Sequence, residues 1–409
     1  MASITTGRDT TKSGSLIIAG SGISSVAHLT LETVSHLKNA DNVFYLVGDP
    51  VTEAFIQENN KSTTNLVAHY ATSKHRYQTY VEMAEVMLRE VRAGHSVFGI
   101  FYGHPGVLTT PAHRALTLAR QEGYEARMLP GVSSVDYMFA DLELEPGQHG
   151  CMIHEATDLL ARDRRLDPSV HNIILQPSRV GSATLEKEAS KFQLLVDRLV
   201  RDFGPDHKIV HYSGAVLPQS SSAMVVFVIE NLRNEQLANQ IRSTSILYIP
   251  PRDIVPVHPD AAAALKLPDM LGLLSTSVQW VGPRFIETAD YGPVERKFVD
   301  QLERQVIPEG QQSLRASTAM RKFMINLALD PNGLKEYKES PSAVAAGVPG
   351  LTDRERSALA IASEGPIFVV MSRTDDEEPT EEQLMEADRN GARIVDSCTM
   401  CTLGGGRNS

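Results

Sequence analysis

The chain has 409 residues, enough for roughly two or three domains, and its 42% hydrophobic and 22% charged content is typical of a soluble globular protein. A formal net charge of −11 argues against nucleic acid or an anionic membrane as a partner, because both bind basic surfaces. No apolar run approaches the ~20 residues of a membrane span, no secretory signal is found, and three cysteines build no disulfide framework, so we expect a cytoplasmic protein.

Residues 1 to about 251 alternate between strand and helix patterns, which favours an α/β domain with helices on both faces of its sheets. The predicted strands are Leu16–Ala19, Val43–Val47, Val97–Tyr102, Glu125–Leu129, Asn172–Gln176, Ile209–Tyr212, Met224–Ile229 and Ser245–Ile249. The predicted helices are Val51–Asn60, Gln78–Arg92, Pro111–Glu122, Phe192–Phe203 and Asn231–Ile241. Pro250-Pro251 ends this domain, since neither proline can donate a hydrogen bond to a neighbouring strand.

From residue 252 onward strand patterns become rare. Amphipathic helices are predicted at Ser317–Leu329 and at Leu351–Ala362, the second with a capping box made by Thr352 and Glu355.

Near the end of the chain, an acidic linker, Asp375–Glu378, precedes a short helix. Thr380 and Gln383 cap this helix, which reaches Arg389 and stops at Asn390-Gly391. The remaining residues, 392–409, show neither periodicity nor alternation, so we expect a flexible tail.

Three predicted strands run directly into glycine-containing loops. These loops lie in Leu16-Ile-Ile-Ala-Gly-Ser-Gly-Ile23, Phe101-Tyr-Gly-His-Pro-Gly-Val107 and Met128-Leu-Pro-Gly-Val-Ser-Ser134. Open α/β sheets bind ligands at the carboxyl ends of their strands, so the loops predict a nucleotide-like ligand held by backbone N–H groups.

The first loop is a poor match to the dinucleotide-binding pattern G-x-G-x-x-G, because Ser25 stands at the third glycine. Asp49 follows the next strand and either reads a ribose hydroxyl or caps the helix that starts near Val51.

A second cluster of chemically useful side chains lies at residues 69–80. Arg76 and Tyr80 stand four residues apart and share one face of a helix, and Tyr70 precedes them on the incoming loop. An arginine with two or three phenols suits a site that holds an amide or carboxyl oxygen and moves a proton. The alternative interpretation is aromatic packing beside a solvated arginine.

Metal-binding patterns are weak. His28, His36, His113 and His207 stand singly, without the spacing or carboxylate neighbour of a zinc site, so we interpret them as structural. Cys398-Thr-Met-Cys401 lacks the second Cys/His pair of a zinc knuckle, and no metal is predicted.

The three glycine loops and Gly48-Asp-Pro50 together resemble the methyltransferases of the tetrapyrrole-methylase fold. The closer resemblance is to one branch, the fungal borosin precursors similar to the omphalotin peptide α-N-methyltransferase, and it covers nearly the whole chain. It rests also on Asp49–Phe55, Glu155–Leu160, Val210–Tyr212, Tyr248–Pro251, Leu327–Pro331 and Leu351–Arg356.

The resemblance implies a tetrapyrrole-methylase-like, two-lobed α/β methyltransferase domain at residues 1–251, a helical clasp for dimerisation at 252–378, and a linker helix with a substrate tail at 379–409. It implies transfer of methyl groups from S-adenosyl-L-methionine to backbone amide nitrogens of the chain's own tail, leaving S-adenosyl-L-homocysteine. The implied partner is a second copy of the chain, interlocked so that each tail lies in the other's active site. A downstream protease would release the product.

The resemblance also assigns site residues. Catalytic roles are implied for Tyr70, Arg76, Tyr80 and Tyr102. Cofactor contacts are implied for Tyr102, His104, Val107, Ser134, Gln176, Gly214, Ser245 and Ile246. In this interpretation Arg76 and a tyrosine stabilise charge on the amide oxygen, and Tyr70 or Tyr80 relays the proton.

The tail departs from the family pattern, because Ala392–Leu403 is polar where family tails are mostly Val, Ile and Gly. The apolar run Pro366–Met371 is a rival candidate for the modified segment, although its position favours a role in anchoring the tail. Two other functions stay open: methylation of a separate small molecule by the same fold, and a non-catalytic, ligand-binding dimer.

Overall fold

The computed structural model describes residues 13–71, 74–147, 149–184, 189–256, 258–264, 296, 299–304, 313–373 and 378–390. The chain divides into two compact units, Met1–Glu287 and Thr288–Ser409. The predicted tail, with Cys398 and Cys401, lies outside the described residues, as does most of the acidic linker.

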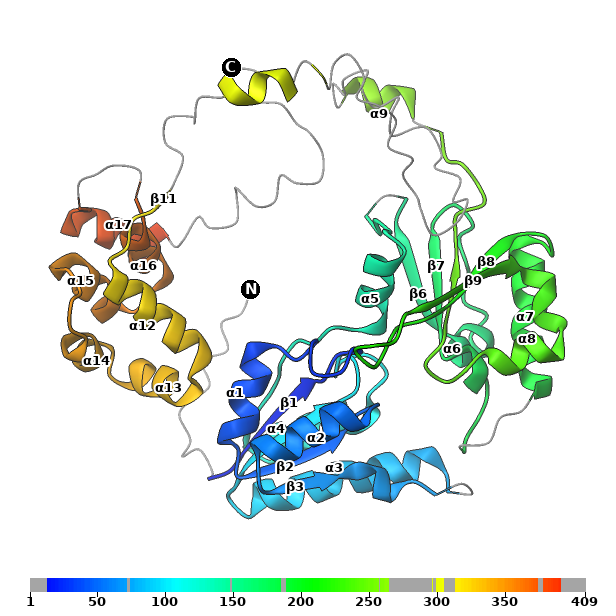
Figure 1. Ribbon diagram of the computed structural model, residues 1–409, viewed down its shortest axis with the longest axis horizontal. Coiled ribbons are helices and arrows are strands. Elements are labelled where there is room, and N and C mark those ends of the chain that lie inside the picture. The colour runs from blue at the N-terminus through cyan, green and yellow to red at the C-terminus, as the bar shows by residue number, and fades with distance from the viewer. Residues whose placement is uncertain are drawn as a thin grey trace. The chain divides into compact units, whose positions relative to one another are not determined.

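The first lobe of the first unit is built on a sheet that has, within the described residues, five parallel strands in the order β3-β2-β4-β1-β5 (Figure 1). The strands are β1 (Ser15–Gly20), β2 (Asn42–Leu46), β3 (Thr63–Asn65), β4 (Ser96–Phe101) and β5 (Glu125–Met128). The central strands β1 and β4 are almost continuously buried, as their unbroken apolar sequences require in a sheet that is covered on both faces.

Helices cover both faces of this sheet. On one face, α1 (Leu31–Asn39) and α2 (Pro50–Asn59) bury Leu37 and Ile56. On the other, α3 (Arg76–Arg92) follows the 3-10 turn η1 (Leu66–His69) and packs with α4 (Thr110–Gln121). The arrangement is doubly wound, so the carboxyl ends of all five strands meet at one edge.

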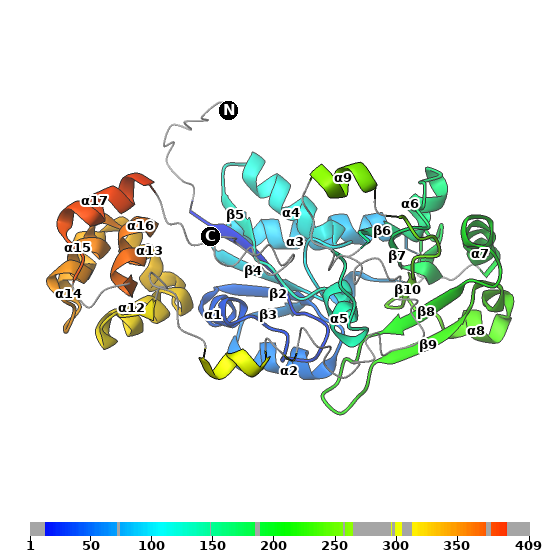
Figure 2. The ribbon, with the colours of Figure 1, turned by 90° about the horizontal axis from the view of Figure 1, so that it is seen from above.

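The second lobe has a mixed sheet with the order β6-β7-β10-β8-β9 (Figure 2). Its strands are β6 (Cys151–Glu155), β7 (His171–Leu175), β8 (Lys208–Ser213), β9 (Ala223–Val228) and β10 (Ile246–Ile249). Only β6 and β7 pair in parallel, and β10 runs antiparallel to both of its neighbours.

One face of the second sheet is covered by α5, and the other by α6, α7 and α8 together with η3. These elements are α5 (Ser134–Asp141), α6 (Ala156–Ala161), η2 (Pro177–Arg179), α7 (Ala189–Phe203), η3 (Ile229–Arg233), α8 (Glu235–Gln240) and, further along, α9 (Pro259–Ala264).

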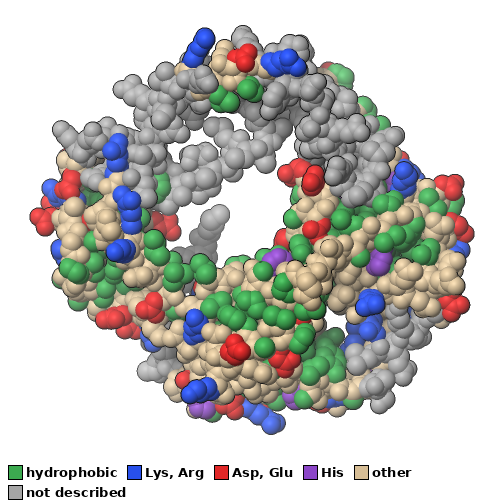
Figure 3. All heavy atoms as spheres, viewed as in Figure 1, with side chains coloured by type: hydrophobic (Ala, Val, Ile, Leu, Met, Phe, Trp, Pro, Cys, Tyr) green, Lys and Arg blue, Asp and Glu red, His purple; other side chains and the backbone are tan. Residues whose placement is uncertain are grey.

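The edge strand β9 exposes apolar side chains on both of its faces. Met224, Val225 and Val226 are each more than a third exposed, and hydrophobic side chains are visible over β8 and β9 in Figure 3. Natural edge strands usually carry a lysine, a proline or a bulge that discourages association. The sequence Ala-Met-Val-Val-Phe-Val of β9 contains neither lysine nor proline.

The sequence predicted every strand from β1 to β10 except the short β3 and β6, with ends within two residues. The predicted helix Asn231–Ile241 is wrong in detail, because Asn234 interrupts it: η3 ends there and Asn234 caps α8 instead. Among the described helices of the first unit, α1, α5, α6 and α9 were not predicted. The expected fold class, two α/β lobes followed by a helical region, is confirmed.

The second unit is mainly helical. Its elements are η5 (Leu302–Arg304), β11 (Ser313–Leu314), α12 (Thr318–Leu329), α13 (Pro331–Glu339), α14 (Pro341–Gly347), α15 (Asp353–Ile361), α16 (Glu364–Met371), β12 (Ser372–Arg373) and α17 (Glu381–Asn390). Both predicted capping boxes are confirmed, Thr352 with Glu355 at α15 and Thr380 with Gln383 at α17. The rival segment Pro366–Met371 lies in α16, which packs between α15 and α17.

Glu355 is a buried carboxylate that joins two helix N-termini. It accepts hydrogen bonds from the backbone N–H and hydroxyl of Ser317, each at 2.7 Å, and from the N–H of Thr352 at 3.0 Å. Ser317 caps α12 and Thr352 caps α15, so the carboxylate also lies near the positive ends of two helix dipoles.

Replacing Glu355 with alanine should therefore leave three donors without their acceptor and lower the free energy of opening α12 and α15 by about 2–3 kcal/mol. Native-state hydrogen exchange of the amides in these helices measures this change. Glu381→Gln is the control, because the ion pair of Glu381 with Arg354 is exposed and its loss should change little. Equal effects of the two substitutions would contradict the assignment.

Candidate active site

The three glycine loops meet with their backbones in direct contact. A Cβ atom on Gly20 would lie 2.1 Å from the carbonyl oxygen of Gly103, and one on Gly131 would lie 3.0 Å from the Cα of Gly20. Gly22 and Gly103 form a two-way bridge, with N···O distances of 3.3 and 3.0 Å. Only glycine permits this approach, so the loops brace one another at the edge of the first sheet.

The first loop does not offer its N–H groups to a ligand, contrary to the expectation from sequence. The N–H groups of Ser21 and Gly22 donate to the carbonyls of Phe101 and Gly103, and that of Ser25 donates to Val216. The next two, those of residues 23 and 24, donate to Nδ1 of His28, at 3.2 and 3.1 Å. Backbone binding of a phosphate at this loop is therefore excluded in this conformation.

Asp49 is a helix cap. Its carboxylate accepts from the N–H of Thr52 at 2.8 Å and from the hydroxyl of Ser25 at 2.7 Å. Of the two interpretations of Asp49, capping is the one that the structure shows, and it removes the remaining support for a dinucleotide fingerprint.

A cavity of about 330 Å³ lies between the two lobes. Its lining residues are Ile23, Tyr70, Tyr102, Gly103, His104, Val107, Leu108, Thr109, Ser133, Ser134, Leu175, Gln176, Ser243, Thr244, Ser245 and Ile246. The volume lies in the range of ~300–1,000 Å³ that is typical of small-molecule sites. No Lys, Arg, Asp or Glu is among these described lining residues, so the walls are apolar groups, hydroxyls, amides and the imidazole of His104.

The direction of the strands explains why distant segments meet here. The loop after β4 and the end of β7 reach the cavity at their carboxyl ends, as expected for parallel strands. β10 runs antiparallel to β7, so it is the amino end of β10, at Ser245 and Ile246, that lies at the same edge.

Eight of the residues implied by the resemblance line this cavity: Tyr70, Tyr102, His104, Val107, Ser134, Gln176, Ser245 and Ile246. Arg76, Tyr80 and Gly214 are not among the lining residues. A Cβ on Gly214 would lie 2.8 Å from the ring of Tyr137 and 3.2 Å from the side chain of Ile23, so this glycine allows the close packing of one cavity wall.

Tyr70, Tyr80 and two arginines form a cluster beside the cavity. Burial raises the pKa of Tyr70 to about 12; the charge of Tyr80 and a hydrogen bond with it act in the same direction, whereas Arg76 and Arg179 lower it. The phenol of Tyr70 is therefore neutral at physiological pH. Arg179, on η2, was not singled out from the sequence.

Arg76 also connects the lobes. Its Nη2 donates to the carbonyl of Ser182 at 2.7 Å, and its backbone N–H donates to the carbonyl of Ala183 at 2.8 Å. The segment from Gln176 to Ala183 thus runs from the cavity wall to the start of α3.

The ring of Tyr102 lies close to Gly48. A Cβ on Gly48 would lie 2.7 Å from the ring of Tyr102, so Gly48 makes room for it. Burial raises the pKa of Tyr102 to about 12, and the charge of Asp49 adds to the effect. The neighbouring His104 accepts a hydrogen bond from the N–H of Gly106 at Nδ1, at 2.9 Å, which shapes the loop.

Two lining residues hold a left-handed backbone conformation that disfavours side chains. Gln176 has φ 53° and Leu108 has φ 55°. Such conformations cost about 1–3 kcal/mol each and cluster at ligand-binding sites.

The histidines interpreted as structural have protein partners: His28 accepts the two N–H groups described above, and Nε2 atoms of His113 and His207 pair with the carbonyls of Gly106 and Pro250. His36 lies 2.8 Å from a guanidinium nitrogen of Arg127. Within the described part of the chain, no group of three or more His, Cys, Asp or Glu could hold a metal ion, and no helix is long and apolar enough to cross a membrane.

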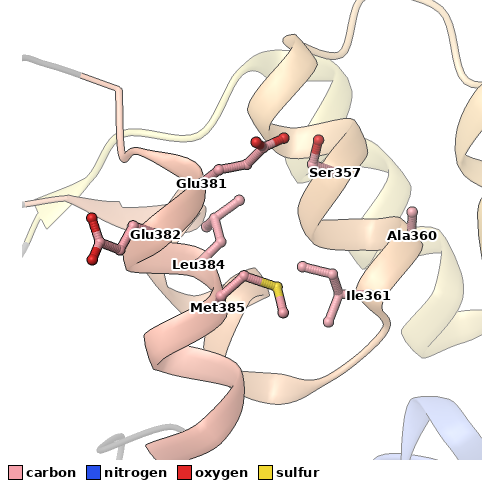
Figure 4. Close-up of a pocket in the computed structure, with 7 residues that line it drawn as sticks. All are labelled: Ser357, Ala360, Ile361, Glu381, Glu382, Leu384 and Met385. Atoms are coloured by element: carbon pink, nitrogen blue, oxygen red, sulfur yellow. The ribbon is translucent and has the colours of Figure 1, made fainter.

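A larger cavity of about 450 Å³ lies in the second unit, between α15 and α17 (Figure 4). Leu384 and Met385 of α17 face Ile361 of α15 across it, with Glu381 and Glu382 at its rim. Its lining contains a single hydroxyl and none of the residues implied by the resemblance. The cavity between the lobes is therefore the better candidate for chemistry.

Comparison with known proteins identifies the family to which the chain belongs. Residues 15–215 match the family of Tetrapyrrole (Corrin/Porphyrin) Methylases, and residues 290–403 match the Borosin biosynthesis clasp domain. The chain is 50% identical over 385 residues to a methyltransferase/ribosomally synthesized type I borosin cyclic peptide precursor of Serendipita vermifera subsp. bescii, covering 92% of this chain and 94% of that protein. The chain belongs to the borosin precursor methyltransferases.

A second relative agrees with this membership. A type I borosin precursor of Mycena rosella is 48% identical, over 94% of this chain and 98% of its own length. Among solved structures, the uroporphyrin-III-C-methyltransferase from Thermus thermophilus matches 58% of this chain and 92% of its own, with 18% identity and a TM-score of 0.42. The resemblance to borosin precursors is confirmed, and the chain is a methyltransferase.

In this borosin precursor the three-glycine contact should control the stability of the first unit. Gly20→Ala places a methyl group against the carbonyl oxygen of Gly103 and should lower the free energy of unfolding by about 1–3 kcal/mol. Denaturant unfolding followed by circular dichroism measures the loss. Gly147→Ala is the matched control, because its new Cβ meets only the flexible carboxylate of Glu145. A Gly20→Ala protein as stable as the control would show that the loops can separate freely.

Proposed function

We propose that the chain is an S-adenosyl-L-methionine-dependent peptide backbone N-methyltransferase that modifies its own C-terminal tail, with the tail of one protomer entering the active site of its partner. The observation that carries this proposal is the cavity between the lobes, with a cluster of tyrosines and arginines beside it. The names of the relatives support it further, because each describes both a methyltransferase and a cyclic peptide precursor.

The cavity lining fits S-adenosyl-L-methionine better than a phosphorylated cofactor. A pyrophosphate calls for basic side chains or free loop N–H groups, and the described lining residues include no Lys or Arg. A nucleoside joined to an amino acid matches hydroxyls, amides and apolar walls. Tyr102, Gln176 and Ser245 would hold it, and when bound it supplies an electrophilic methyl group.

The protein must activate the peptide nitrogen, because this nitrogen is a poor nucleophile. Its lone pair is delocalised into the carbonyl, so methylation requires loss of the N–H proton and stabilisation of charge on the amide oxygen. Neutral phenols and a guanidinium are suitable hydrogen-bond donors for that oxygen.

The raised pKa values of the phenols support this donor role. With pKa values of about 12, Tyr70 and Tyr102 keep their protons at neutral pH, so they donate hydrogen bonds and do not act as resting bases. Of the two relay residues that the resemblance implies, Tyr70 is therefore disfavoured as a resting proton acceptor. Arg76 has one N–H donor on the carbonyl of Ser182 and, as a five-donor group, has others for an amide oxygen.

The tail, and not the rival segment, is the proposed substrate. Residues 366–371 lie in α16, where backbone N–H groups are used by the helix and where Pro366 and Val370 are buried. Methylation there would require the helix to unfold. We therefore place the acceptors within Ala392–Leu403, where successive amides of an extended chain can pass the site one at a time.

Action between two protomers requires a dimer. The exposed apolar edge strand β9 supports self-association, since such an edge is a template for pairing with another chain. The match of residues 290–403 to the borosin clasp domain supports it as well.

The central test is complementation between two chains, one with a defective active site and one without a substrate tail. One carries Arg76→Ala with an intact tail, and the other is active but lacks residues 391–409. Co-expression should restore methyl-sized mass increments beyond residue 391 of the Arg76→Ala chain, whereas that chain alone should show none. Tandem mass spectrometry locates the increments, and Arg89→Ala, an exposed arginine on the same helix, is the control that should behave as the unaltered chain.

Each other outcome contradicts one part of the proposal. Increments on the Arg76→Ala chain alone would remove Arg76 from catalysis. Normal modification of the unaltered chain without complementation would show that each chain modifies itself. An unmodified chain that methylates an added small molecule would establish the alternative of a small-molecule methyltransferase. A chain that binds S-adenosyl-L-methionine without transferring its methyl group would establish the alternative of a non-catalytic, ligand-binding dimer.

The phenols give a separate prediction. Because burial favours their neutral form, the raised pKa values of Tyr70 and Tyr102 stabilise the fold below pH ~10, and this contribution is lost as the pH rises through about 12. The difference in phenolate absorbance between the unaltered chain and Tyr70→Phe, recorded by rapid pH jump, should have a midpoint near 12. In denaturant the midpoint should return to ~10. A native midpoint at or below 10 would restore Tyr70 as a candidate base.

A further inference from the structure

Ser245 is a lining residue of the cavity whose hydroxyl is held from two sides. It accepts a hydrogen bond from the backbone N–H of Arg242 at 2.9 Å and pairs with Nε2 of His211 at 2.7 Å. The first bond closes the turn that presents residues 243–246 to the cavity. The second crosses from the adjacent strand β8.

His211 is buried, with 8% of its surface exposed, and Ser245 is 2% exposed. Burial lowers the pKa of His211, so the imidazole is neutral at physiological pH. A neutral imidazole can donate from Nε2 or accept there, but not both. If Nε2 donates to the Ser245 hydroxyl, both lone pairs of the hydroxyl are used and its proton is available to a ligand. If Nε2 accepts the hydroxyl proton, the hydroxyl keeps one lone pair that can accept from a ligand. In either tautomer the imidazole fixes which way Ser245 points.

We infer that His211 is a positioning residue for the cofactor: it orients the Ser245 hydroxyl and holds the 243–246 wall of the cavity, without itself touching the ligand. The inference rests on the proposed function for the identity of the ligand. It predicts that His211 determines cofactor affinity and leaves the rate of methyl transfer at saturation unchanged.

The direction of side chains on β8 supports a positioning role for His211. His211 and Tyr212 are consecutive on β8 and so point to opposite faces of the second sheet. Tyr212 bonds to Asp141 of α5 at 2.7 Å, on the face covered by that helix. His211, on the other face, reaches Ser245 in the turn before β10. Among the described residues, this is the only side-chain hydrogen bond from β8 to a lining residue of the cavity.

The test is calorimetric titration of the full-length chain with S-adenosyl-L-homocysteine, which binds without turnover. His211→Leu should raise the Kd about tenfold, which corresponds to ~1.4 kcal/mol, the size of one buried hydrogen bond. His211→Gln, whose amide can replace Nε2 as donor or acceptor, should recover most of the affinity. In methylation assays the half-saturating concentration of S-adenosyl-L-methionine should rise in parallel, with an unchanged maximal rate.

His171→Leu is the matched control. His171 is also a buried histidine of the same sheet, bonded to Tyr248 at 2.9 Å, but it lies at the start of β7, away from the cavity end of that strand. The substitution His171→Leu should lower the melting temperature as His211→Leu does, but it should leave the Kd for S-adenosyl-L-homocysteine unchanged.

A double-mutant cycle with Ser245→Ala completes the test. If His211 acts through Ser245, the two substitutions should be non-additive, and His211→Leu should have little effect once the hydroxyl is gone. Additive effects, or equal Kd values for His211→Leu and the unaltered chain, would overturn the inference. Failure of the unaltered chain to bind S-adenosyl-L-homocysteine would instead overturn the proposed function.

Discussion

The contact among Gly20, Gly103 and Gly131 is the constraint on which the site depends. Because these backbones touch, the loops after β1, β4 and β5 cannot move independently, and Tyr102 and His104 leave the sheet from a fixed point. The loops serve as a frame and not as an anion-binding surface. Their N–H groups are used largely within the protein, which leaves recognition of a ligand to side chains and to the second lobe.

The second lobe completes the site through a reversal of strand direction. Gln176 follows the carboxyl end of β7, whereas Ser245 precedes the amino end of β10, and the antiparallel pairing of these strands brings both to the cavity. A neutral cavity and a cationic cluster thus lie side by side. In the proposed function, this arrangement separates binding of the methyl donor from polarisation of the amide, so that one can be altered with little effect on the other.

Most of the fold was predictable from the sequence because periodicity is a local property. Buried strands such as β4 and capped helices such as α15 are specified by a few neighbouring residues. The short strand β3 has no apolar residue, β6 has three apolar residues followed by a histidine and a glutamate, and Asn234 interrupted a helix pattern by acting as a cap. In the candidate site, the loops that contain glycine and hydroxyl side chains could be recognised from the sequence, but Arg179 and His211 could not. Their roles depend on contacts between lobes and between strands that no sequence spacing contains.

The hydrogen bonds that cross between the lobes have a mechanical consequence. Ser25 bonds to Val216, and Arg76 bonds to Ser182 and Ala183, with each bond worth ~1 kcal/mol. The ring of His28 also contacts that of Tyr137 across the lobes, whereas each sheet has its own larger apolar cores. Separating the two lobes therefore costs much less free energy than unfolding either one. If the substrate is a peptide, as proposed, it can therefore enter between the lobes and leave again by breaking these contacts, while both lobes stay folded.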